Sequence, residues 1–253
     1  AGGEAPERAT ELAHLYQAGI RAGDPTKAAG WSVAAGTQAY ESAAFFEALG
    51  HARDARSALD LAGQGEARLA VEARALELRV LRRTGDPDDV DRAATDALGR
   101  AIDLGDPDLL ADIAAGEVGP LANHDPARPS TQPIALAERA LAALPADAAA
   151  GRVRVAAART FWVHRTNDPR GPQLADEVVD LARSLDDPVL LATTIATVLH
   201  AYQRSTLAAE LDRRTDELQE LIDRAGLDAL RAPALWGRSF RVARAGDLEG
   251  WAA

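Results

Sequence analysis

Five Asp-Pro pairs divide the chain at regular intervals, and they constrain its fold more than any other feature. They lie at Asp24-Pro25, Asp86-Pro87, Asp106-Pro107, Asp168-Pro169 and Asp187-Pro188. An aspartate side chain caps free backbone N–H groups at a helix start, and proline fits the next position because its missing N–H would have no partner there. Each pair therefore predicts the first turn of an α-helix.

The intervals between these predicted helix starts alternate. Counted from aspartate to aspartate they are 62, 20, 62 and 19 residues, and a degenerate sixth signal, Asp247-Leu248, follows after another 60. Each signal is therefore 79 to 82 residues away from the second signal after it. Self-similarity at a fixed period is typical of repeat architectures, so we expect a block of about 82 residues to recur along the chain.

The residues between the signals have a helical pattern. Leu, Ala and Val recur at three- and four-residue steps, and no stretch shows the sustained alternation of a β-strand. Helices are expected near residues 6–22, 25–37, 41–62, 66–84, 88–104, 107–118, 133–144, 148–166, 172–185, 188–204, 208–225 and 229–245. Each block then holds two antiparallel helix pairs of about 41 residues, longer than a tetratricopeptide unit and near the HEAT range.

The predicted fold is therefore all-α: a single tetratricopeptide-like α-solenoid of stacked antiparallel helix pairs over residues 1–253. A repeat unit of this kind cannot bury its apolar face alone, so neighbouring units must stabilise one another. Small residues at 34–36 and 156–158 would let helices approach closely. The proline-rich stretch 123–133 is incompatible with a helix interior. We interpret it as a surface loop, with a boundary between two half-arrays within 119–133 as the alternative.

Composition narrows the classes of function. The chain has 39 acidic and 28 basic residues and a net charge of −11, whereas binding to nucleic acid needs clustered Lys and Arg. No apolar run reaches the ~20 residues of a membrane span, and no signal peptide is evident at the start. We expect a cytoplasmic location, without contact to nucleic acid or membrane. The lack of Met and the helix signal close to the end predict a fragment of a longer chain.

No motif for catalysis, cofactor or metal binding is found. Lys27 is the only lysine and lies outside any phosphate-binding loop, and there is no cysteine. The acidic run from Asp86 to Asp91 is interpreted as a helix cap with an acidic first turn, since it lacks the ligand spacing of a calcium loop. The histidines lack metal-ligand spacing; they are His14, His51, His124, His164 and His200. We therefore expect no enzyme activity, cofactor or metal.

Aromatic residues make up only 4% of the chain, so their positions are candidates for a binding surface on the concave face of the solenoid. Trp162, His164 and Arg165 are expected to face this groove. The other copies carry Val80 and Arg241 at the Trp162 position and so do not require a large core residue there. The remaining candidates are Phe161, Trp236 and Phe240, with core packing as the alternative for any of them. If Trp162 faces a groove, its replacement by Ala weakens partner binding without changing the melting temperature.

Several segments resemble a known class of helical array. They are ELAHLY at 11–16, AGDPTKAA at 22–29, LGDPDLLA at 104–111 and LARSLDDPVLLA at 181–192. Together they resemble the tetratricopeptide-like arrays that follow the ATPase module in large bacterial STAND-type regulators, including the LuxR-type and antibiotic-regulator-type ATP-binding proteins. The resemblance covers nearly the whole chain.

The resemblance implies a sensor or scaffold region. Such a region receives a protein partner or a small-molecule inducer and controls the neighbouring ATPase and output domains of the same chain. Two alternatives remain: a free-standing scaffold or adaptor, and an all-α enzyme with an unrecognised site. An upstream ATPase module and a downstream output domain in the full reading frame would support the regulator.

Overall fold

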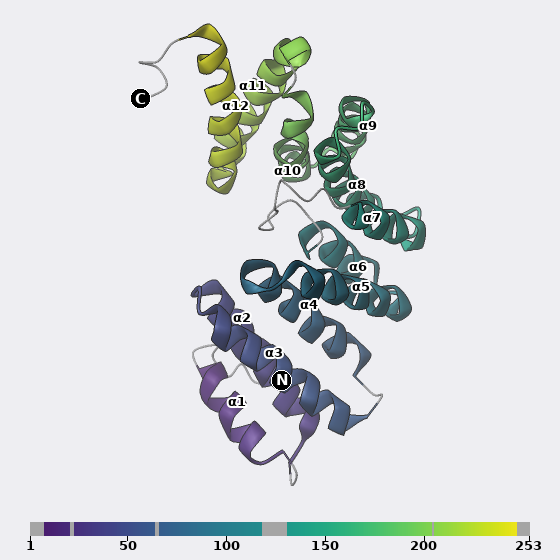
Figure 1. The fold of residues 1–253 in the computed structure, drawn as a ribbon, viewed down its shortest axis with the longest axis vertical. Helices are drawn as coiled ribbons and strands as arrows, with labels where there is room; N and C mark the ends of the chain where they lie inside the picture. Colours follow the sequence, from purple (N-terminus) through teal and green to yellow (C-terminus); the bar gives the residue numbers. More distant parts are fainter. Residues whose placement is uncertain (1–7, 21–22, 64–65, 118–130, 204, 247–253) are drawn as a thin grey trace. The chain divides into compact units, whose positions relative to one another are not determined.

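The computed structural model describes residues 8–20, 23–63, 66–117, 131–203 and 205–246. Its regular elements are all helical, and no β-strand occurs in these ranges, so the all-α fold class is confirmed. The helices gather into two compact units. Unit 1 contains helices α1 to α6 and unit 2 contains helices α7 to α12 (Figure 1).

Unit 1 is a succession of helices that pack in chain order. Its helices are α1 (Ala9–Ala18), α2 (Pro25–Glu41), α3 (Phe45–Ala62), α4 (Ala67–Thr84), α5 (Pro87–Leu104) and α6 (Pro107–Asp112), after which a π-helical turn spans Ile113–Glu117. Each helix contacts the next one, and α2 also contacts α4. Helices that follow one another in the chain are therefore neighbours in space.

Unit 2 repeats this packing pattern. Its elements are α7 (Gln132–Ala143), α8 (Ala149–Arg165), α9 (Gly171–Arg183), α10 (Pro188–Val198), α11 (Ala208–Ala225) and α12 (Arg231–Ala245), with short 3-10 turns η3 (Leu199–Tyr202), η4 (Ser205–Leu207) and η5 (Asp228–Leu230). Consecutive α-helices contact each other, and α8 also contacts α10. All the helices expected from the sequence are present, although α1, α6 and α10 end four to six residues earlier than expected and α3 begins four residues later.

Four of the five Asp-Pro signals begin helices as predicted. The carboxylates of Asp24, Asp86, Asp106 and Asp187 accept backbone N–H hydrogen bonds at the starts of α2, α5, α6 and α10. Asp168 is the exception: its carboxylate binds the backbone N–H of Arg170 at 2.9 Å and the Arg170 guanidinium at 2.7 Å, and α9 begins only at Gly171. It therefore shapes the turn before the helix. The sixth signal, Asp247-Leu248, lies outside the described residues.

The predicted period is present in the helix starts. Helices α4, α8 and α12 begin at residues 67, 149 and 231, two steps of 82, and α2, α6 and α10 begin at 25, 107 and 188. Seven buried positions of α4 and α8 coincide in this register. In α4 they are Val71, Ala73, Ala75, Leu76, Leu78, Val80 and Leu81; in α8 they are Val153, Val155, Ala157, Ala158, Thr160, Trp162 and Val163. The single continuous solenoid, and the boundary within 119–133, remain predictions.

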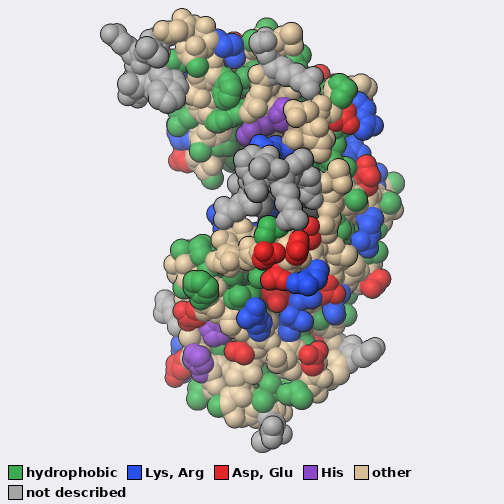
Figure 2. Space-filling view, viewed as in Figure 1, with side chains coloured by type: hydrophobic (Ala, Val, Ile, Leu, Met, Phe, Trp, Pro, Cys, Tyr) green, Lys and Arg blue, Asp and Glu red, His purple; other side chains and the backbone are tan. Residues whose placement is uncertain are grey.

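Small residues and ion pairs hold the helices of unit 1 close together. A Cβ atom added to Gly36 of α2 would lie 2.6 Å from Cδ2 of Leu76 on α4, so any larger residue would force the Leu76 side chain to move. Glu77, which is 6% exposed, accepts hydrogen bonds from Arg56 of α3 and Arg74 of α4. Acidic and basic side chains also lie next to one another on the face of this unit shown in Figure 2.

Candidate partner-binding site

Five rings from three elements of unit 2 form a connected series, which we call the aromatic ladder: Trp162 and Phe161 of α8, His200 of η3, and Trp236 and Phe240 of α12. Its central ring is His200. This ring stacks on Trp236 with 4.2 Å between centroids and meets Phe161 edge-on at 5.4 Å. The ladder therefore joins α8 to α12 through the short turn that follows α10.

An ionic network around the buried Arg214 side chain holds the turn that carries His200. The Tyr202 hydroxyl, two residues further on, donates a 2.8 Å hydrogen bond to Asp176 of α9. The same carboxylate accepts a 2.9 Å bond from Arg214 of α11, whose side chain is 3% exposed and also pairs with Glu210 and Glu217. Burial together with the bond to Asp176 raises the pKa of Tyr202 above its usual range, so the phenol stays a hydrogen-bond donor.

The structure corrects the expectation that Trp162 faces a groove. Its side chain is 4% exposed, and its ring packs edge-on against Phe161 at a centroid distance of 5.5 Å. Val80, at the same register position of α4, is 0% exposed. The position is thus a core position in both copies. Trp162 contributes to stability and cannot offer its face to a partner.

The other ladder side chains are partly exposed. Part of the surface of each side chain is open to solvent in Phe161, His200, Trp236 and Phe240. Trp236 and Phe240 also pack against the core of unit 2. Rings of this kind are held in place by the core on one side and keep another side accessible. They provide rigid apolar contact area at a low cost in conformational entropy, which suits them to binding.

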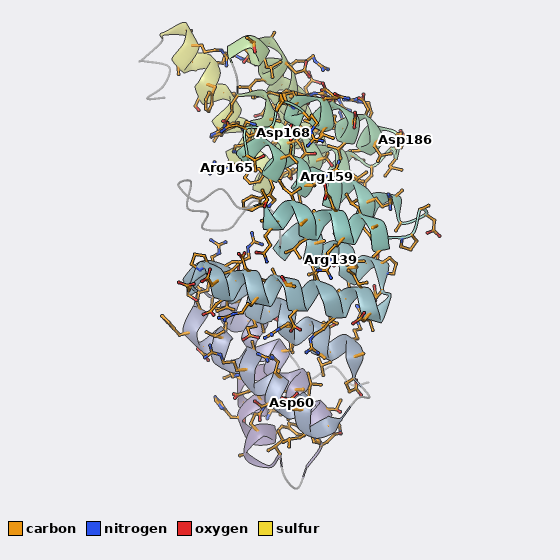
Figure 3. The ribbon with its side chains drawn as sticks, turned by 45° about the vertical axis from the view of Figure 1, so that its right-hand side comes forward. Asp60, Arg139, Arg159, Arg165, Asp168 and Asp186 are labelled. Atoms are coloured by element: carbon orange, nitrogen blue, oxygen red, sulfur yellow. The ribbon has the colours of Figure 1, made fainter. Side chains whose placement is uncertain are left out.

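Two basic side chains lie beside the ladder. His164 and Arg165 follow Phe161 by three and four residues, so all three share one face of α8. Arg165 is exposed at the C-terminal end of this helix, just before the turn with Asp168 (Figure 3). It forms no ion pair with any other residue in the described parts of the chain. The structure thus gathers the predicted site residues around His200.

The environment of His200 keeps its imidazole neutral. Burial lowers the pKa of His200 to about 4, and the nearby charges of His164 and Arg165 add to this effect. Its Nδ1 atom is buried and has no hydrogen-bond partner among the residues that the structure describes.

We expect unit 2 to lose stability between pH 6.5 and pH 4 because of His200. The pKa of His200 is lower in the folded than in the unfolded state, so the unfolded chain binds more protons in this window. The free energy of unfolding is therefore highest above pH 6.5 and falls as the pH drops toward 4. The loss should be about 2 kcal/mol after allowance for screening at the partly exposed ring. Denaturant titrations at pH 7 and pH 4 should show a correspondingly smaller difference for His200→Phe. An unchanged difference would contradict a buried neutral His200.

The ladder and the two basic side chains beside it, His164 and Arg165, combine apolar and charged contacts. Among the described residues, no three His, Asp or Glu side chains are arranged to hold a metal ion. Phe161, His200 and Trp236 offer apolar and aromatic contact, and Arg165 offers a fixed positive charge. This combination fits a ligand with an apolar or planar body and a negatively charged group.

His200 is the member of the candidate site that sequence reasoning misses. It carries no motif, and its contacts join residues that are 36 and 39 positions away in the sequence. The acidic run at Asp86, by contrast, is confirmed as a helix cap: Asp86 accepts from the backbone N–H of Asp88, and Asp89 pairs with Arg92.

Comparisons with known proteins identify no relative. No protein-family model matches the chain, and neither the curated proteins nor the solved structures contain a significant match. None of the described helices has both the length and the apolar character needed to cross a lipid bilayer. The comparisons therefore add no information on function to the residues of the candidate site and to the sequence resemblance.

Proposed function

We propose that this chain is a helical-repeat interaction module without catalysis of its own, and that it binds a protein partner or a small-molecule inducer at the aromatic ladder of unit 2. The observation that carries this proposal is the partly exposed stack of Trp236 on His200 next to the exposed cation Arg165, which has no ion-pair partner among the described residues. Aromatic and arginine side chains dominate the binding energy of most interfaces. In this acidic chain, a positive edge beside apolar rings favours a partner that is itself anionic.

We also propose the larger context that the STAND resemblance implies. In this context the module is cytoplasmic, touches neither nucleic acid nor membrane, and transmits binding to neighbouring ATPase and output domains of the same chain. The resemblance of segments such as LGDPDLLA at 104–111 is its only support. A parent reading frame without an ATPase module would favour a free-standing adaptor, and the binding site would be the same.

A thermal-shift screen of the full chain tests the binding site. Compounds and short peptides with a carboxylate or phosphate next to an aromatic group should raise the melting temperature, since ligands that bind only the folded state stabilise it. For a binder found in this way, Arg165→Glu should weaken the affinity by about tenfold or more, because a charge-assisted contact is lost and repulsion is added. Isothermal titration calorimetry measures the change.

The matched control is Arg139→Glu. Arg139 is an exposed arginine of α7, and its replacement changes the net charge by the same amount (Figure 3). It should leave the affinity within about twofold of the unaltered chain, because surface charges away from the site act only weakly at physiological salt. Equal losses in the two variants, or no loss in Arg165→Glu, would place the binding site elsewhere.

A further inference from the structure

Helices α1 and α3 of unit 1 bring two histidines together. The ring of His14 on α1 lies 5.7 Å, centroid to centroid, from the ring of His51 on α3. Three residues further along both helices, the side-chain amide of Gln17 donates a 3.1 Å hydrogen bond to the backbone carbonyl of Asp54. Both contacts join positions 37 residues apart. The two helices therefore run in the same direction here, and two contacts hold the histidines next to each other.

One nitrogen of this pair is buried and unpaired. The His51 side chain is 5% exposed, and its Nε2 atom forms no hydrogen bond to any residue that the structure describes. The carboxylate of Glu47, one turn earlier on α3, has its Oε1 atom 3.8 Å from this nitrogen, which is too far for a hydrogen bond. The Nε2 atom of His51 is therefore available to bind another group.

The two side chains around this nitrogen are free to move. His14 is exposed and Glu47 is 54% exposed, and histidine surface is visible in purple over unit 1 in Figure 2. Glu47 and His51 are four residues apart on one helix, so both lie on the same face of α3. The site thus has one fixed imidazole, with a second imidazole and a carboxylate that can turn toward it from the solvent side.

These distances suit a transition-metal ion. Imidazole nitrogen is a preferred ligand of Zn²⁺, Ni²⁺ and Cu²⁺. With metal–nitrogen distances of about 2.0–2.1 Å, an ion bound by one nitrogen of each ring holds the ring centroids about 5–6 Å apart, as is found for His14 and His51. Two ligand atoms of one tetrahedral zinc ion are about 3.3 Å apart, so a small rotation brings the Glu47 carboxylate within reach.

The arrangement observed is an incomplete set of ligands. As the side chains stand, no three His, Asp or Glu groups of the described residues are placed to hold a metal ion. His14 and Glu47 must therefore turn toward the ion, and water fills the remaining position. Sequence spacing reveals little of this site, because His14 and His51 belong to different helices.

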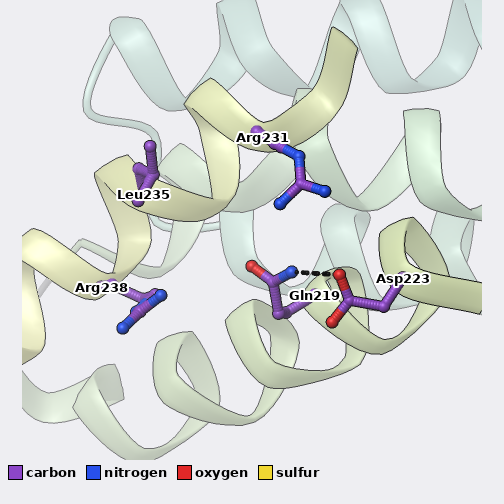
Figure 4. A pocket seen from close by; sticks show the side chains of 5 residues that line it. All are labelled: Gln219, Asp223, Arg231, Leu235 and Arg238. Carbon is purple, nitrogen blue, oxygen red and sulfur yellow. Dashed lines mark hydrogen bonds between the residues drawn. The ribbon is translucent and has the colours of Figure 1, made fainter. Parts of the chain in front are cut away.

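A hollow elsewhere in the chain lacks such a ligand. It lies between α11 and α12, has a volume of about 360 Å³, and is lined by Gln219, Asp223, Arg231, Leu235 and Arg238 (Figure 4). Gln219 and Asp223 bond to each other at 2.9 Å. Within the described ranges, none of the buried side-chain atoms without a hydrogen-bond partner belongs to this lining.

We propose that His14, His51 and Glu47 form a binding site for a divalent transition-metal ion of the Zn²⁺ type, which links α1 to α3. His51 supplies its buried Nε2 atom, His14 supplies a second imidazole nitrogen, and Glu47 supplies a carboxylate oxygen. The metal stabilises unit 1, because it binds the folded state and ties together two helices that are separated in the sequence by α2. The site is independent of the aromatic ladder, which belongs to unit 2.

Zinc alone is the probe that tests this site. The full chain is freed of metal with a chelator, dialysed and titrated with Zn²⁺ by isothermal titration calorimetry, and we expect saturable binding. His14→Ala and Glu47→Gln should each weaken the affinity by about tenfold or more. Both changes are made at exposed side chains, so the fold is kept. The matched control is His124→Ala, which removes a histidine elsewhere in the sequence and should leave the affinity within about twofold.

NMR and thermal unfolding show where zinc binds. The imidazole nitrogen signals of His14 and His51 should shift together with saturation, while those of His164 and His200 stay in place. Zinc should raise the melting temperature of the unaltered chain but not that of His14→Ala. Absence of saturable binding up to millimolar zinc would overturn the proposal. So would equal losses in His14→Ala and His124→Ala, or binding that leaves the His14 and His51 signals unchanged.

Discussion

Replacing Trp162 by Ala is expected to lower the free energy of unfolding by about 3–4 kcal/mol. The side chain is 4% exposed, contacts Phe161 edge-on, and fills a position that is also buried in α4. Its removal leaves a cavity that the neighbouring helices can fill only in part, and such cavities cost free energy in addition to the lost transfer term. Denaturant unfolding followed by far-UV circular dichroism measures the loss without depending on tryptophan fluorescence.

Leu181→Ala serves as the control for this experiment. Leu181 is a large apolar residue of unit 2, but it is 44% exposed, so its truncation should cost less than about 1 kcal/mol. If Trp162→Ala costs no more than Leu181→Ala, the Trp162 ring is not part of the core. The groove-facing interpretation from the sequence would then be right and the structural correction wrong.

Replacing Arg214 by Ala is expected to cost about 3 kcal/mol of stability. Its guanidinium is 3% exposed and bonds Asp176 at 2.9 Å and Glu210 at 2.8 Å, with Glu217 at 3.3 Å. Without the cation, three carboxylates remain close together and repel one another, and the buried stem of the side chain leaves a void. The turn that carries His200 should loosen as well, since Asp176 also anchors Tyr202.

Arg213→Ala is the matched control, because it removes the neighbouring arginine of the same helix. The Arg213 side chain is 58% exposed and pairs with Glu210 on the surface. Exposed ion pairs contribute little, so the expected change is below about 0.5 kcal/mol. Both variants are compared by chemical denaturation at pH 7. Similar losses of stability for Arg213→Ala and Arg214→Ala would show that the Arg214 guanidinium is not buried.

The order and the bounds of the helices are largely predictable from the sequence because their signals are local. Asp106 and Asp187, each followed by proline, cap α6 and α10 at the expected residue. The ends of the same two helices are not predictable in this way. The apolar pattern continues, but the backbone changes to a π-helical turn after Asp112 and to a 3-10 turn after Val198. Contacts from distant residues, such as Asp176 with Tyr202, stabilise the second change.

The candidate site is less predictable, since it depends on contacts between copies of the repeat. When positions are counted back from the Asp signals, Trp162 of α8 corresponds to Arg241 of α12. When they are counted from the observed helix starts, Trp162 corresponds to Arg244 of α12. Both counts match it with Val80 of α4, which is buried. The shorter last interval of the signals caused this difference. No spacing in the sequence could reveal that His200 lies between Phe161 and Trp236, because three separate elements bring these rings together.

Binding of a partner at the aromatic ladder is tested most directly by NMR. The chain is labelled with ¹⁵N and titrated with the tightest binder from the thermal-shift screen, and the indole N–H signals of Trp236 and Trp31 are compared. Trp236 stacks on His200 in unit 2, whereas Trp31 packs against a separate cluster of α1 and α2 in unit 1. We expect the signals of Trp236 and of the His200 ring to shift with saturation and the Trp31 signal to stay in place. A shift of Trp31 without one of Trp236, or binding that moves neither indole, would contradict a site at the ladder.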